Sequence, residues 1–296
     1  MKTGCWETKN HSSFKIGGAL KTALFPESLD ELADMLKNEK YDYVLGNCTN
    51  ILFSSDYIDK TVIFTDKLNN IEINGNRVKV LCGAKGAQAS RLCRDNSLSG
   101  FEFLIGLPGS FGGMLCMNAS AHNQAVSDCF VSADVYNLET NSVITLKKEN
   151  LGFRYRNSDI QSKQYTVLSA EFELKKDSID NINERMQQNL DFRKEHQPLN
   201  YPNAGSVFKN PENNSAGRLL DLCGLKGENC GGAQVFEYHA NFIVNKNNAS
   251  SKDVLKLMHI MFSKVYDNYK IKLTPEIKYI GSNTEEIEIW NKITQT

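Results

Sequence analysis

Ile105-Gly-Leu-Pro-Gly-Ser-Phe-Gly-Gly113 is the stretch that most constrains the fold of this 296-residue chain. It places four glycines and one proline in an apolar neighbourhood that continues into Met114–Asn118. Glycines in such surroundings indicate a backbone that approaches another group closely. The stretch does not match the G-x-G-x-x-G fingerprint, and the sequence contains no G-x-x-x-x-G-K-[ST] motif. A dinucleotide would therefore bind in a fold other than the Rossmann fold.

The composition is that of a globular protein without a marked charge. Of the residues, 41% are apolar and 23% are charged, and 34 Lys and Arg balance 35 Asp and Glu to a formal net charge of −1. We expect two or three compact units, and neither nucleic acid nor anionic lipid as a partner. The polar N-terminus has no apolar signal region, and no run approaches the roughly 18 apolar residues of a membrane helix. We therefore expect a cytoplasmic protein with no membrane partner.

Eight cysteines are spaced irregularly and form no C-x-x-C pair. In a long cytoplasmic chain such cysteines are expected to be buried free thiols rather than disulfides. No metal site is expected. The cysteines are Cys5, Cys48, Cys82, Cys93, Cys116, Cys129, Cys223 and Cys230.

The first part of the chain predicts a small α/β unit. Ser28 and Glu31 form a capping box before apolar residues at helical spacing, which predicts a helix over 29–37. Two apolar runs, 43–45 and 61–65, are separated by a polar loop and predict strands.

A second part, richer in predicted strands, follows. Asn74-Gly75 predicts the turn of a hairpin between 71–73 and 78–81, since both residues tolerate positive φ. The other predicted elements are strands over 129–137, 142–146 and 167–174 and a helix over 87–94.

The third part begins with a polar, charged run that predicts an exposed helix over 177–195 and a boundary at Gln197-Pro198. Ser215 and Gly224 bound a predicted helix over 216–223. Two apolar runs, 233–236 and 242–244, precede a long predicted helix over 252–269. The residues predicted to form its buried face are Val254, Leu257, Met258, Met261, Phe262 and Val265.

Two segments suit anionic ligands. Gly46-Asn-Cys-Thr-Asn50 follows a predicted strand, and such a loop can turn backbone N–H groups toward a phosphate, although a surface turn uses the same residues. In an extended segment Arg154 and Arg156 would share a face, which suits a carboxylate or a phosphate. Exposed strand arginines are common, so the residues alone favour a surface role.

Two further segments carry candidate chemical groups. Ser206 lies in Ala204-Gly-Ser-Val-Phe-Lys-Asn-Pro211, which lacks a G-x-S-x-G motif and a neighbouring His-Asp pair. A nucleophilic serine is therefore unsupported, whereas a serine that donates a proton remains possible. Glu276, in Thr274-Pro-Glu-Ile277, would by itself be taken for a surface carboxylate.

Read in order, these segments resemble the UDP-N-acetylenolpyruvoylglucosamine reductase (MurB) family over nearly the whole chain. Several separate motifs in one order are more specific than any single one. The matching segments are HSSFKIGG (11–18), GNCTN (46–50), IGLPGSFGG (105–113), MNASA (117–121), FRYRNS (153–158), NAGSVFKNP (203–211), AGRLLDLCGLKG (216–227), GGAQVFEYHANFIVN (231–245) and TPEIKYIG (274–281).

The resemblance implies an α+β fold. Its FAD-binding region, of the vanillyl-alcohol-oxidase (PCMH) type, has two subdomains, 1–68 and 69–176, and an α+β substrate-binding domain follows at 177–296. The residues implied to bind FAD are Gly46, Asn47, Cys48, Thr49, Asn50, Ile51, Pro108, Gly109, Ser110, Gly112, Gly113 and Asn118.

The implied reaction belongs to peptidoglycan precursor synthesis. NADPH reduces FAD, and the enolpyruvyl group of UDP-N-acetyl-3-O-(1-carboxyvinyl)-glucosamine then receives hydride at C3 to give UDP-N-acetylmuramate. Such a site needs a cation for the carboxylate and a proton donor at C2, roles that suit Arg156 and Ser206, while Glu276 resembles the carboxylate that polarises the intermediate or its proton relay. The residues implied to bind the UDP-sugar are His122, His196, Lys209, Asn210 and His239.

The chain between 174 and 197 is too short for the tyrosine-bearing insertion of one branch, so this chain resembles the branch without it. Cys48 stands where the family usually has glycine, and Thr49 replaces the usual serine. His122 and His196 stand where tyrosine and lysine are common. A histidine there can supply partial positive charge. We expect a monomer.

Two alternatives remain at this point. One is an FAD-linked oxidase of the same fold, which would need a substrate base and often a covalently attached flavin. The other is a non-catalytic relative that binds flavin or a nucleotide-sugar. The segments around Ser206 and Glu276 count against the oxidase, and Arg156, Ser206 and Glu276 count against the non-catalytic relative.

Overall fold

The computed structural model describes residues 2–162 and 164–294, which divide into two compact units. Unit 1 consists mainly of Leu24–Asn47 and Val62–Arg193. Unit 2 consists of Thr3–Ala23, Cys48–Thr61 and the chain from Lys194 onward. Each unit buries a hydrophobic cluster of its own.

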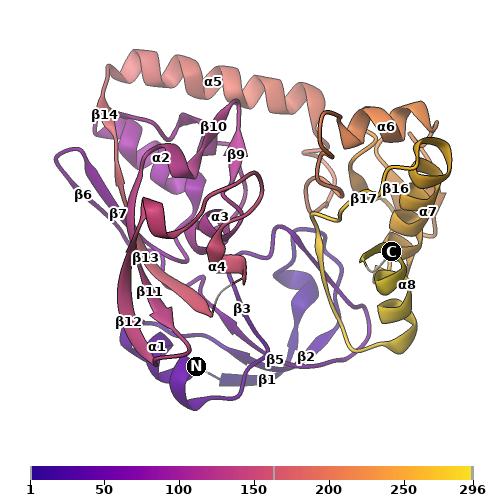
Figure 1. Cartoon of the computed structure of the whole chain (residues 1–296), viewed down its shortest axis with the longest axis horizontal. Helices are drawn as coiled ribbons and strands as arrows, with labels where there is room; N and C mark the ends of the chain where they lie inside the picture. The colour runs from indigo at the N-terminus through magenta and orange to yellow at the C-terminus, as the bar shows by residue number, and fades with distance from the viewer. Residues whose placement is uncertain (1, 163, 295–296) are drawn as a thin grey trace. The chain divides into compact units, whose positions relative to one another are not determined.

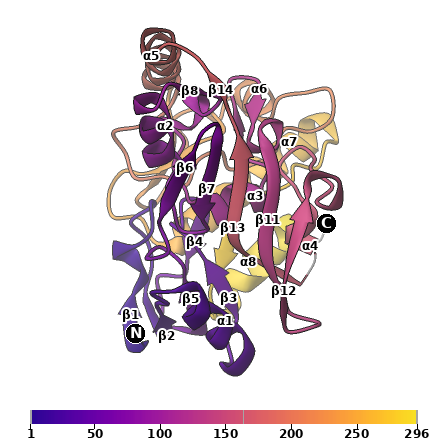
Figure 2. The same ribbon diagram turned by 90° about the vertical axis from the view of Figure 1, so that its left-hand side faces the viewer.

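The centre of unit 1 is a five-stranded antiparallel sheet of order β12-β11-β13-β7-β6, whose strands lie side by side in Figure 2. Its strands are β6 (Ile71–Asn74), β7 (Arg77–Leu81), β11 (Phe130–Asn137), β12 (Ser142–Lys147) and β13 (Tyr165–Glu173). These bounds confirm the predicted strands of the second part to within two residues. The central position of β13 explains its nearly continuous burial.

The β6–β7 hairpin turns one residue later than we predict. Asn74 pairs with Arg77, so the turn residues are Gly75 and Asn76, and Gly75 has a φ of +64°. This register sets Ile73 opposite Val78 and so keeps the apolar side chains on one face. The hydrophobic pairing, rather than the Asn-Gly dipeptide, therefore decides the register.

Helices cover this sheet through aromatic and small side chains. α3 (Phe111–Cys116), which the sequence did not predict, packs the Phe111 ring 5.3 Å from the ring of Phe172 on β13. The Phe101 ring also contacts Phe172, at 5.2 Å. α2 (Gly86–Asp95) confirms the predicted helix and buries Ala89 and Cys93. The Ile105–Gly113 stretch is thus anchored on the core of unit 1.

The predicted helix and strands of the first part are also confirmed. Ser28 Oγ accepts from the Glu31 N–H of α1 (Leu29–Asn38) at 3.1 Å, while the Glu31 carboxylate accepts from Glu27 N–H at 2.8 Å. The second contact lies one residue earlier than in a standard capping box. β3 (Tyr43–Leu45) pairs in parallel with the end of β5 (Ile58–Phe64).

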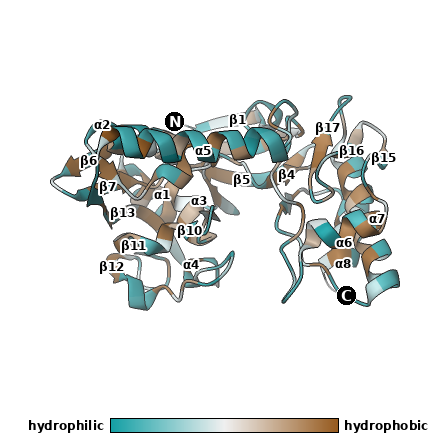
Figure 3. Ribbon diagram, turned by 90° about the horizontal axis from the view of Figure 1, so that it is seen from above, coloured by the Kyte–Doolittle hydropathy of each residue, from teal (hydrophilic) through white to brown (hydrophobic). Residues whose placement is uncertain are grey.

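The remaining elements of unit 1 are short, except for the helix α5 (Ile179–His196). Figure 3 shows that α5 is mostly hydrophilic. The last residues of α5 belong to unit 2. α5 confirms the predicted polar helix and buries Ile182 and Met186. The short elements are β8 (Leu98–Ser99), β9 (Ser120–Ala121), β10 (Gln124–Ala125), α4 (Asp159–Ser162) and β14 (Lys175–Lys176).

Unit 2 packs helices against a three-stranded antiparallel sheet of order β15-β16-β17 (Figure 1). Its long helix α7 begins with a capping box between Ser250 and Asp253, and all six residues predicted for its inner face are buried. The elements are β1 (Lys2–Glu7), β2 (Ala19–Leu24), β4 (Ile51–Phe53), α6 (Ala216–Leu222), β15 (Asn229–Cys230), β16 (Ala233–Val235), β17 (Ile243–Asn245), α7 (Ser251–Tyr269), β18 (Lys278–Ile280) and α8 (Thr284–Thr294).

All eight cysteines are free thiols. Cys48, Cys82 and Cys93 are buried as predicted, and burial raises the pKa of Cys93 to about 12. Cys5 is exposed, so the prediction of burial is wrong there, because β1 leaves that side chain in solvent. The remaining four are only half-buried, so the prediction holds in part for Cys116, Cys129, Cys223 and Cys230. Among residues 2–162 and 164–294, no helix is both long and apolar enough to cross a membrane.

Candidate functional site

In unit 1 the structure brings the two glycine-containing FAD segments together. Gly46 follows β3, and a Cβ atom added to it would lie 2.0 Å from Ser110 Oγ. Ser110 is buried and forms an isolated backbone bridge with Lys85. Glycine at position 46 is therefore required by contact with Ser110, within the protein itself.

The Ile105–Gly113 stretch is held by backbone hydrogen bonds. Phe111 N–H donates to Ala84 O at 2.9 Å and Gly112 N–H to Cys82 O at 2.8 Å. Gly109 has a φ of +131°, in the region that favours glycine, and Pro108 before it is exposed. Gly113 is also exposed, and a Cβ atom there would meet nothing within 4 Å. The stretch thus presents a rigid, open backbone surface.

The residues of unit 1 fit a flavin nucleotide. The side-chain oxygen of Asn47 is buried and has no hydrogen-bond partner within the described chain. Asn118, with φ of +41°, accepts from Ser127 N–H and donates to Arg154 O at 3.2 Å. The open backbone at Gly113 and the buried acceptor of Asn47 are features expected of a surface that binds a ring with N–H donors, such as that of a flavin.

The rest of the first loop belongs to unit 2 and lies beside Glu276. Asn50 Nδ2 donates to Glu276 O at 2.9 Å, and Lys278 N–H donates to Asn50 O at 3.0 Å. Ile51 then pairs with Lys278 as β4 and β18 align in parallel. Thr49 is half-buried.

Cys48 occupies this loop in a left-handed conformation, with φ of +50° and 5% of its side chain exposed. Glycine adopts this conformation without strain, whereas other residues pay about 1–2 kcal/mol. We expect Cys48→Gly to be more stable than Cys48→Ala by about 1 kcal/mol, since both lose the thiol and only glycine relieves the strain. Urea unfolding of the two variants measures the difference. A more stable alanine variant would show that the backbone there is unstrained.

Arg156 occupies a turn rather than a strand, so the prediction that it shares an extended face with Arg154 is wrong. Arg154 and Asn157 exchange backbone hydrogen bonds at 2.9 and 3.2 Å, which places Tyr155 and Arg156 at the turn, with φ of +52° at Arg156. The turn separates the two guanidinium groups. Arg154 pairs with Asp159 at 2.8 Å.

Ser120 orients the Arg156 side chain. Nη1 of Arg156 donates to Ser120 Oγ at 2.9 Å and to Ser120 O at 3.2 Å. The guanidinium carbon also lies 5.5 Å from the centre of the Tyr155 ring. A half-buried guanidinium in a fixed orientation is a planar cation of the kind that binds carboxylates.

His122 belongs to unit 1, where its ring meets the Phe192 ring edge-on at 5.4 Å. Burial and the neighbouring Arg193 lower the pKa of His122, so its imidazole is mostly neutral at pH 7. Arg193, which the sequence did not single out, approaches Gly106 so closely that a Cβ atom there would lie 2.7 Å from Arg193 Cδ. Burial lowers the pKa of Arg193 to about 10, which still leaves it cationic at neutral pH. Arg193 therefore provides the charge near His122.

In unit 2 the Ser206 segment lies between the segments that carry Asn241 and Glu276. Val207 N–H donates to Asn241 O at 2.9 Å, and Glu276 N–H donates to Val207 O at 2.8 Å. Lys209 N–H donates to Thr274 O at 2.8 Å. The backbone thus holds Ser206, Lys209 and Glu276 in three adjacent stretches of chain.

Asn241 is a supporting residue that the sequence did not single out. Its side chain accepts from Phe208 N–H at 3.0 Å and donates to Phe208 O at 2.8 Å, so it holds the segment after Ser206 from both sides. Gly205, with φ of +78°, lets the chain turn into this segment. A single amide within an otherwise apolar run, Ala-Asn-Phe-Ile-Val, was the available indication of this role.

The other predicted substrate residues of unit 2 differ in their surroundings. Asn210 Oδ1 accepts from Ala216 N–H at 3.0 Å and thereby supports the start of α6. His239 Nδ1 accepts from Asn241 N–H at 3.2 Å, and burial lowers the pKa of His239, which favours a neutral ring. His196 is exposed at the end of α5.

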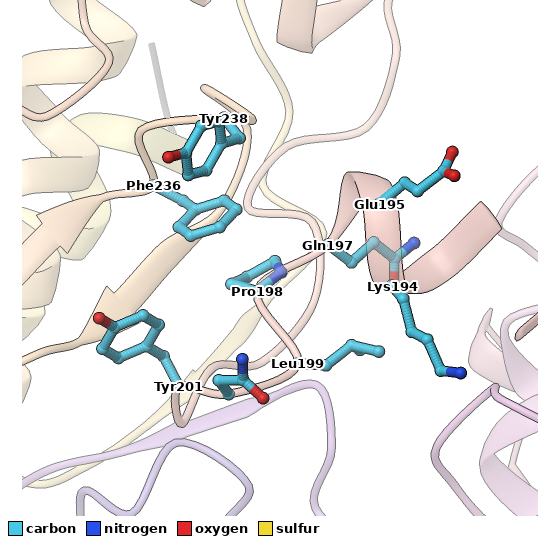
Figure 4. Close-up of a pocket in the computed structure, with 9 residues that line it drawn as sticks. Lys194, Glu195, Gln197, Pro198, Leu199, Tyr201, Phe236 and Tyr238 are labelled. Carbon is cyan, nitrogen blue, oxygen red and sulfur yellow. The ribbon is translucent and has the colours of Figure 1, made fainter. Parts of the chain in front are cut away.

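Unit 2 also contains a pocket of about 330 Å³, which is lined in part by residues that neighbour His196 in the sequence. Figure 4 shows Phe236, Tyr238 and Tyr201 around Pro198 in its wall. Tyr238 is 75% exposed and Tyr201 40% exposed. The sequence did not predict this pocket, because its two sides lie about forty residues apart.

Comparisons with known proteins agree along the chain. Residues 21–147 match the family described as FAD binding domain, and residues 197–280 match UDP-N-acetylenolpyruvoylglucosamine reductase, C-terminal domain. The enzymes of that name from Clostridium kluyveri and Caldicellulosiruptor bescii are 38% and 39% identical to this chain, over 93% and 92% of it and 91% and 88% of the relatives. The crystal structure of MurB from Thermus caldophilus aligns with 94% of this chain and 98% of its own, with a TM-score of 0.80 and 29% identity.

Proposed function

Because this chain belongs to the UDP-N-acetylenolpyruvoylglucosamine reductase family and is an FAD-dependent oxidoreductase of the α+β class, we propose that it uses NADPH to reduce UDP-N-acetyl-3-O-(1-carboxyvinyl)-glucosamine to UDP-N-acetylmuramate. Bound FAD would accept hydride from NADPH and supply it to C3 of the enolpyruvyl group. The observation that carries the residue assignments is the backbone pairing of the Ser206 segment with Glu276.

Hydride addition at C3 leaves negative charge at C2 and in the adjoining carboxylate. Arg156 binds that carboxylate and stabilises the charge. The support is its orientation by Ser120, which fixes the place of a planar, cationic donor group. The positive φ of Arg156 is consistent with a backbone constrained by function.

Ser206 donates the proton to C2, and Glu276 polarises the intermediate or returns the proton to Ser206. A serine hydroxyl donates readily only when a neighbouring group compensates the alkoxide that forms, and the segment of Glu276 is hydrogen-bonded to that of Ser206. Lys209, in the same segment, supplies positive charge nearby.

The UDP-sugar contacts are assigned to His122, His196, Lys209, Asn210 and His239. Since burial lowers the pKa of His122 and of His239, these two act as neutral hydrogen-bonding groups, and Lys209 carries the charge toward the diphosphate. FAD is held by 1–68 and 69–176 and the substrate by 177–296. The protein acts as a monomer in the cytoplasm. Light scattering tests its oligomeric state, and cell fractionation tests its location.

The aromatic pocket of unit 2 suits the uracil ring, because aromatic faces stack on nucleobases. We expect Tyr238→Ala to raise the KM for the UDP-sugar about tenfold and to leave kcat unchanged. Steady-state kinetics at fixed NADPH give both constants. Tyr269→Ala, which truncates a tyrosine 39% exposed on α7, is the control and should change neither. Equal effects of the two variants would contradict the stacking assignment.

Product analysis tests the reaction itself. Turnover in D₂O should give UDP-N-acetylmuramate that carries deuterium at C2, because the proton added there comes from an exchangeable group. Mass spectrometry and NMR locate the label. Absence of product, or product without deuterium at C2, would refute the proposed reaction.

A further inference from the structure

A buried carboxylate lies in unit 2 apart from the groups assigned above. Glu286, on α8, is 3% exposed. Its Oε2 accepts from Ser54 Oγ and from Tyr279 Oη, each at 2.6 Å, and its Oε1 accepts from Ser251 Oγ. α8 follows residue 280, where the match to the C-terminal family domain ends, so this carboxylate belongs to a part of the chain outside that match.

Two of the three donors belong to one pair of strands. Tyr279 lies in β18, and Ser54 follows β4 directly. The two strands pair in parallel, from Ile51 with Lys278 to Phe53 with Ile280. Ser54 N–H continues the pairing by donating to Ile280 O at 2.8 Å. The carboxylate therefore joins the two strands near their carboxyl ends.

The other ends of the same strands carry groups of the proposed site. Asn50 precedes β4, and Glu276 lies two residues before β18. Asn50 Nδ2 donates to Glu276 O at 2.9 Å, and Lys278 N–H donates to Asn50 O at 3.0 Å. Each strand is only three residues long. A shift of β4 against β18 at the Glu286 end would therefore also move Asn50 and Glu276 at the other end.

We propose that Glu286 is a positioning residue that fixes β4 against β18 and thereby sets the places of Asn50 in the FAD loop and of Glu276. The roles of Asn50 and Glu276 in this inference rest on the proposed function. Glu286 acts in this inference through the strands and is assigned no contact with substrate or cofactor.

The chemistry of the cluster explains why a carboxylate suits this place. A buried carboxylate is costly unless its oxygens accept hydrogen bonds, and here three hydroxyls supply them. Burial and the hydrogen bond to Glu286 raise the pKa of Tyr279, so the phenol remains a donor. Gly281 makes room for it, because a Cβ atom there would lie 2.0 Å from Tyr279 Oη. Removal of the carboxylate leaves the buried hydroxyls of Ser54 and Ser251 and the half-buried one of Tyr279 without this acceptor.

Glu286→Gln tests the proposal, with Glu288→Gln, at an exposed position of the same helix, as the control. The amide keeps the size but replaces one acceptor by a donor. We expect kcat per FAD-bound enzyme to fall about tenfold and the Kd for FAD to rise by a similar factor, with kcat and Kd unchanged in the control. A Glu286→Gln variant with wild-type kcat and FAD Kd would overturn the proposal.

Variants that each remove one hydroxyl donor to Glu286 distinguish a positioning role of this residue from a role in stability alone. They can be measured even if Glu286→Gln does not fold. Tyr279→Phe removes a donor on the paired strands, whereas Ser251→Ala removes one on α7. We expect both to lower Tm, and only Tyr279→Phe to lower kcat per bound FAD, measured well below Tm. If both variants change Tm alone, Glu286 is a structural residue and the proposal is wrong.

Hydrogen exchange tests the effect of Glu286 on the strands independently of the proposed function. In Glu286→Gln the amide of Lys278, which bonds to Asn50 O, should exchange about tenfold faster than in wild type. Wild-type protein that binds FAD but yields no UDP-N-acetylmuramate would refute the proposed function, while faster exchange and weaker FAD binding in the variant would still support the effect of Glu286 on the strands. Unchanged exchange would overturn the inference whatever the activity.

Discussion

Replacement of Ser206 by alanine is expected to slow the oxidation of reduced FAD by the enolpyruvyl substrate by about 10²- to 10⁴-fold, the range for loss of a positioned proton donor. The hydroxyl is the group assigned to protonate C2, and its segment is hydrogen-bonded to that of Glu276. Reduction of FAD by NADPH involves no proton transfer to C2, so its rate should stay within twofold of wild type. Anaerobic stopped-flow absorbance measures the two half-reactions separately.

Ser206→Thr and Ser282→Ala are the controls for this result. Threonine retains a hydroxyl and should restore part of the rate. Ser282 is exposed, accepts from Asp59 N–H at 3.0 Å and has no assigned role in the reaction, so Ser282→Ala should leave both rates unchanged. If Ser206→Ala slowed both half-reactions equally, the effect would be structural. If it slowed neither, another group would protonate C2.

Replacement of Arg156 by lysine is expected to lower kcat/KM for the enolpyruvyl substrate by about 10²- to 10³-fold, as when one preorganised donor to a developing anion is removed. Lysine keeps the charge but loses the planar fork that Ser120 holds through Nη1. Because the charge develops as hydride is transferred, kcat should fall by at least the factor by which KM rises. Steady-state kinetics over a range of substrate concentration separate the two constants.

Arg154→Lys is the matched control, since Arg154 lies two residues away, is exposed and pairs with Asp159. We expect its kcat/KM to remain within twofold of wild type, because surface ion pairs contribute little. Similar losses at the two arginines would contradict the assignment and would indicate that the turn, rather than the Arg156 guanidinium, is required.

Elements with strong local patterns could be predicted from the sequence. α7 has a capping box at its start and apolar residues at helical spacing, and α1 follows Ser28 in the same way. Patterns of this kind depend only on neighbours in the chain. The β6–β7 turn was misplaced by one residue, because there the cross-strand pairing of Ile73 with Val78 outweighs the Asn-Gly preference.

Local sequence patterns predicted less of the candidate site than of the helices and strands. The turn at Arg156 uses a positive φ on a residue that rarely adopts it, so an extended segment was the natural expectation for Arg154 and Arg156. The pairing of Val207 with Glu276 joins segments about seventy residues apart, which no local pattern indicates. The family resemblance supplied the link between Ser206 and Glu276. It gave no indication of the contacts of Glu286, because α8 lies outside the matching motifs.

Anaerobic mixing of the purified FAD-bound protein with NADPH, followed by the UDP-linked enolpyruvyl sugar, tests the central claim most directly. The flavin absorbance in the visible region should bleach on addition of NADPH and return in full when the enolpyruvyl sugar is added without oxygen. Bleaching without return of the colour would show that the reduced protein does not use this substrate, as expected of a non-catalytic relative. A flavin that stays yellow with NADPH would indicate an oxidase and contradict the proposed reductase.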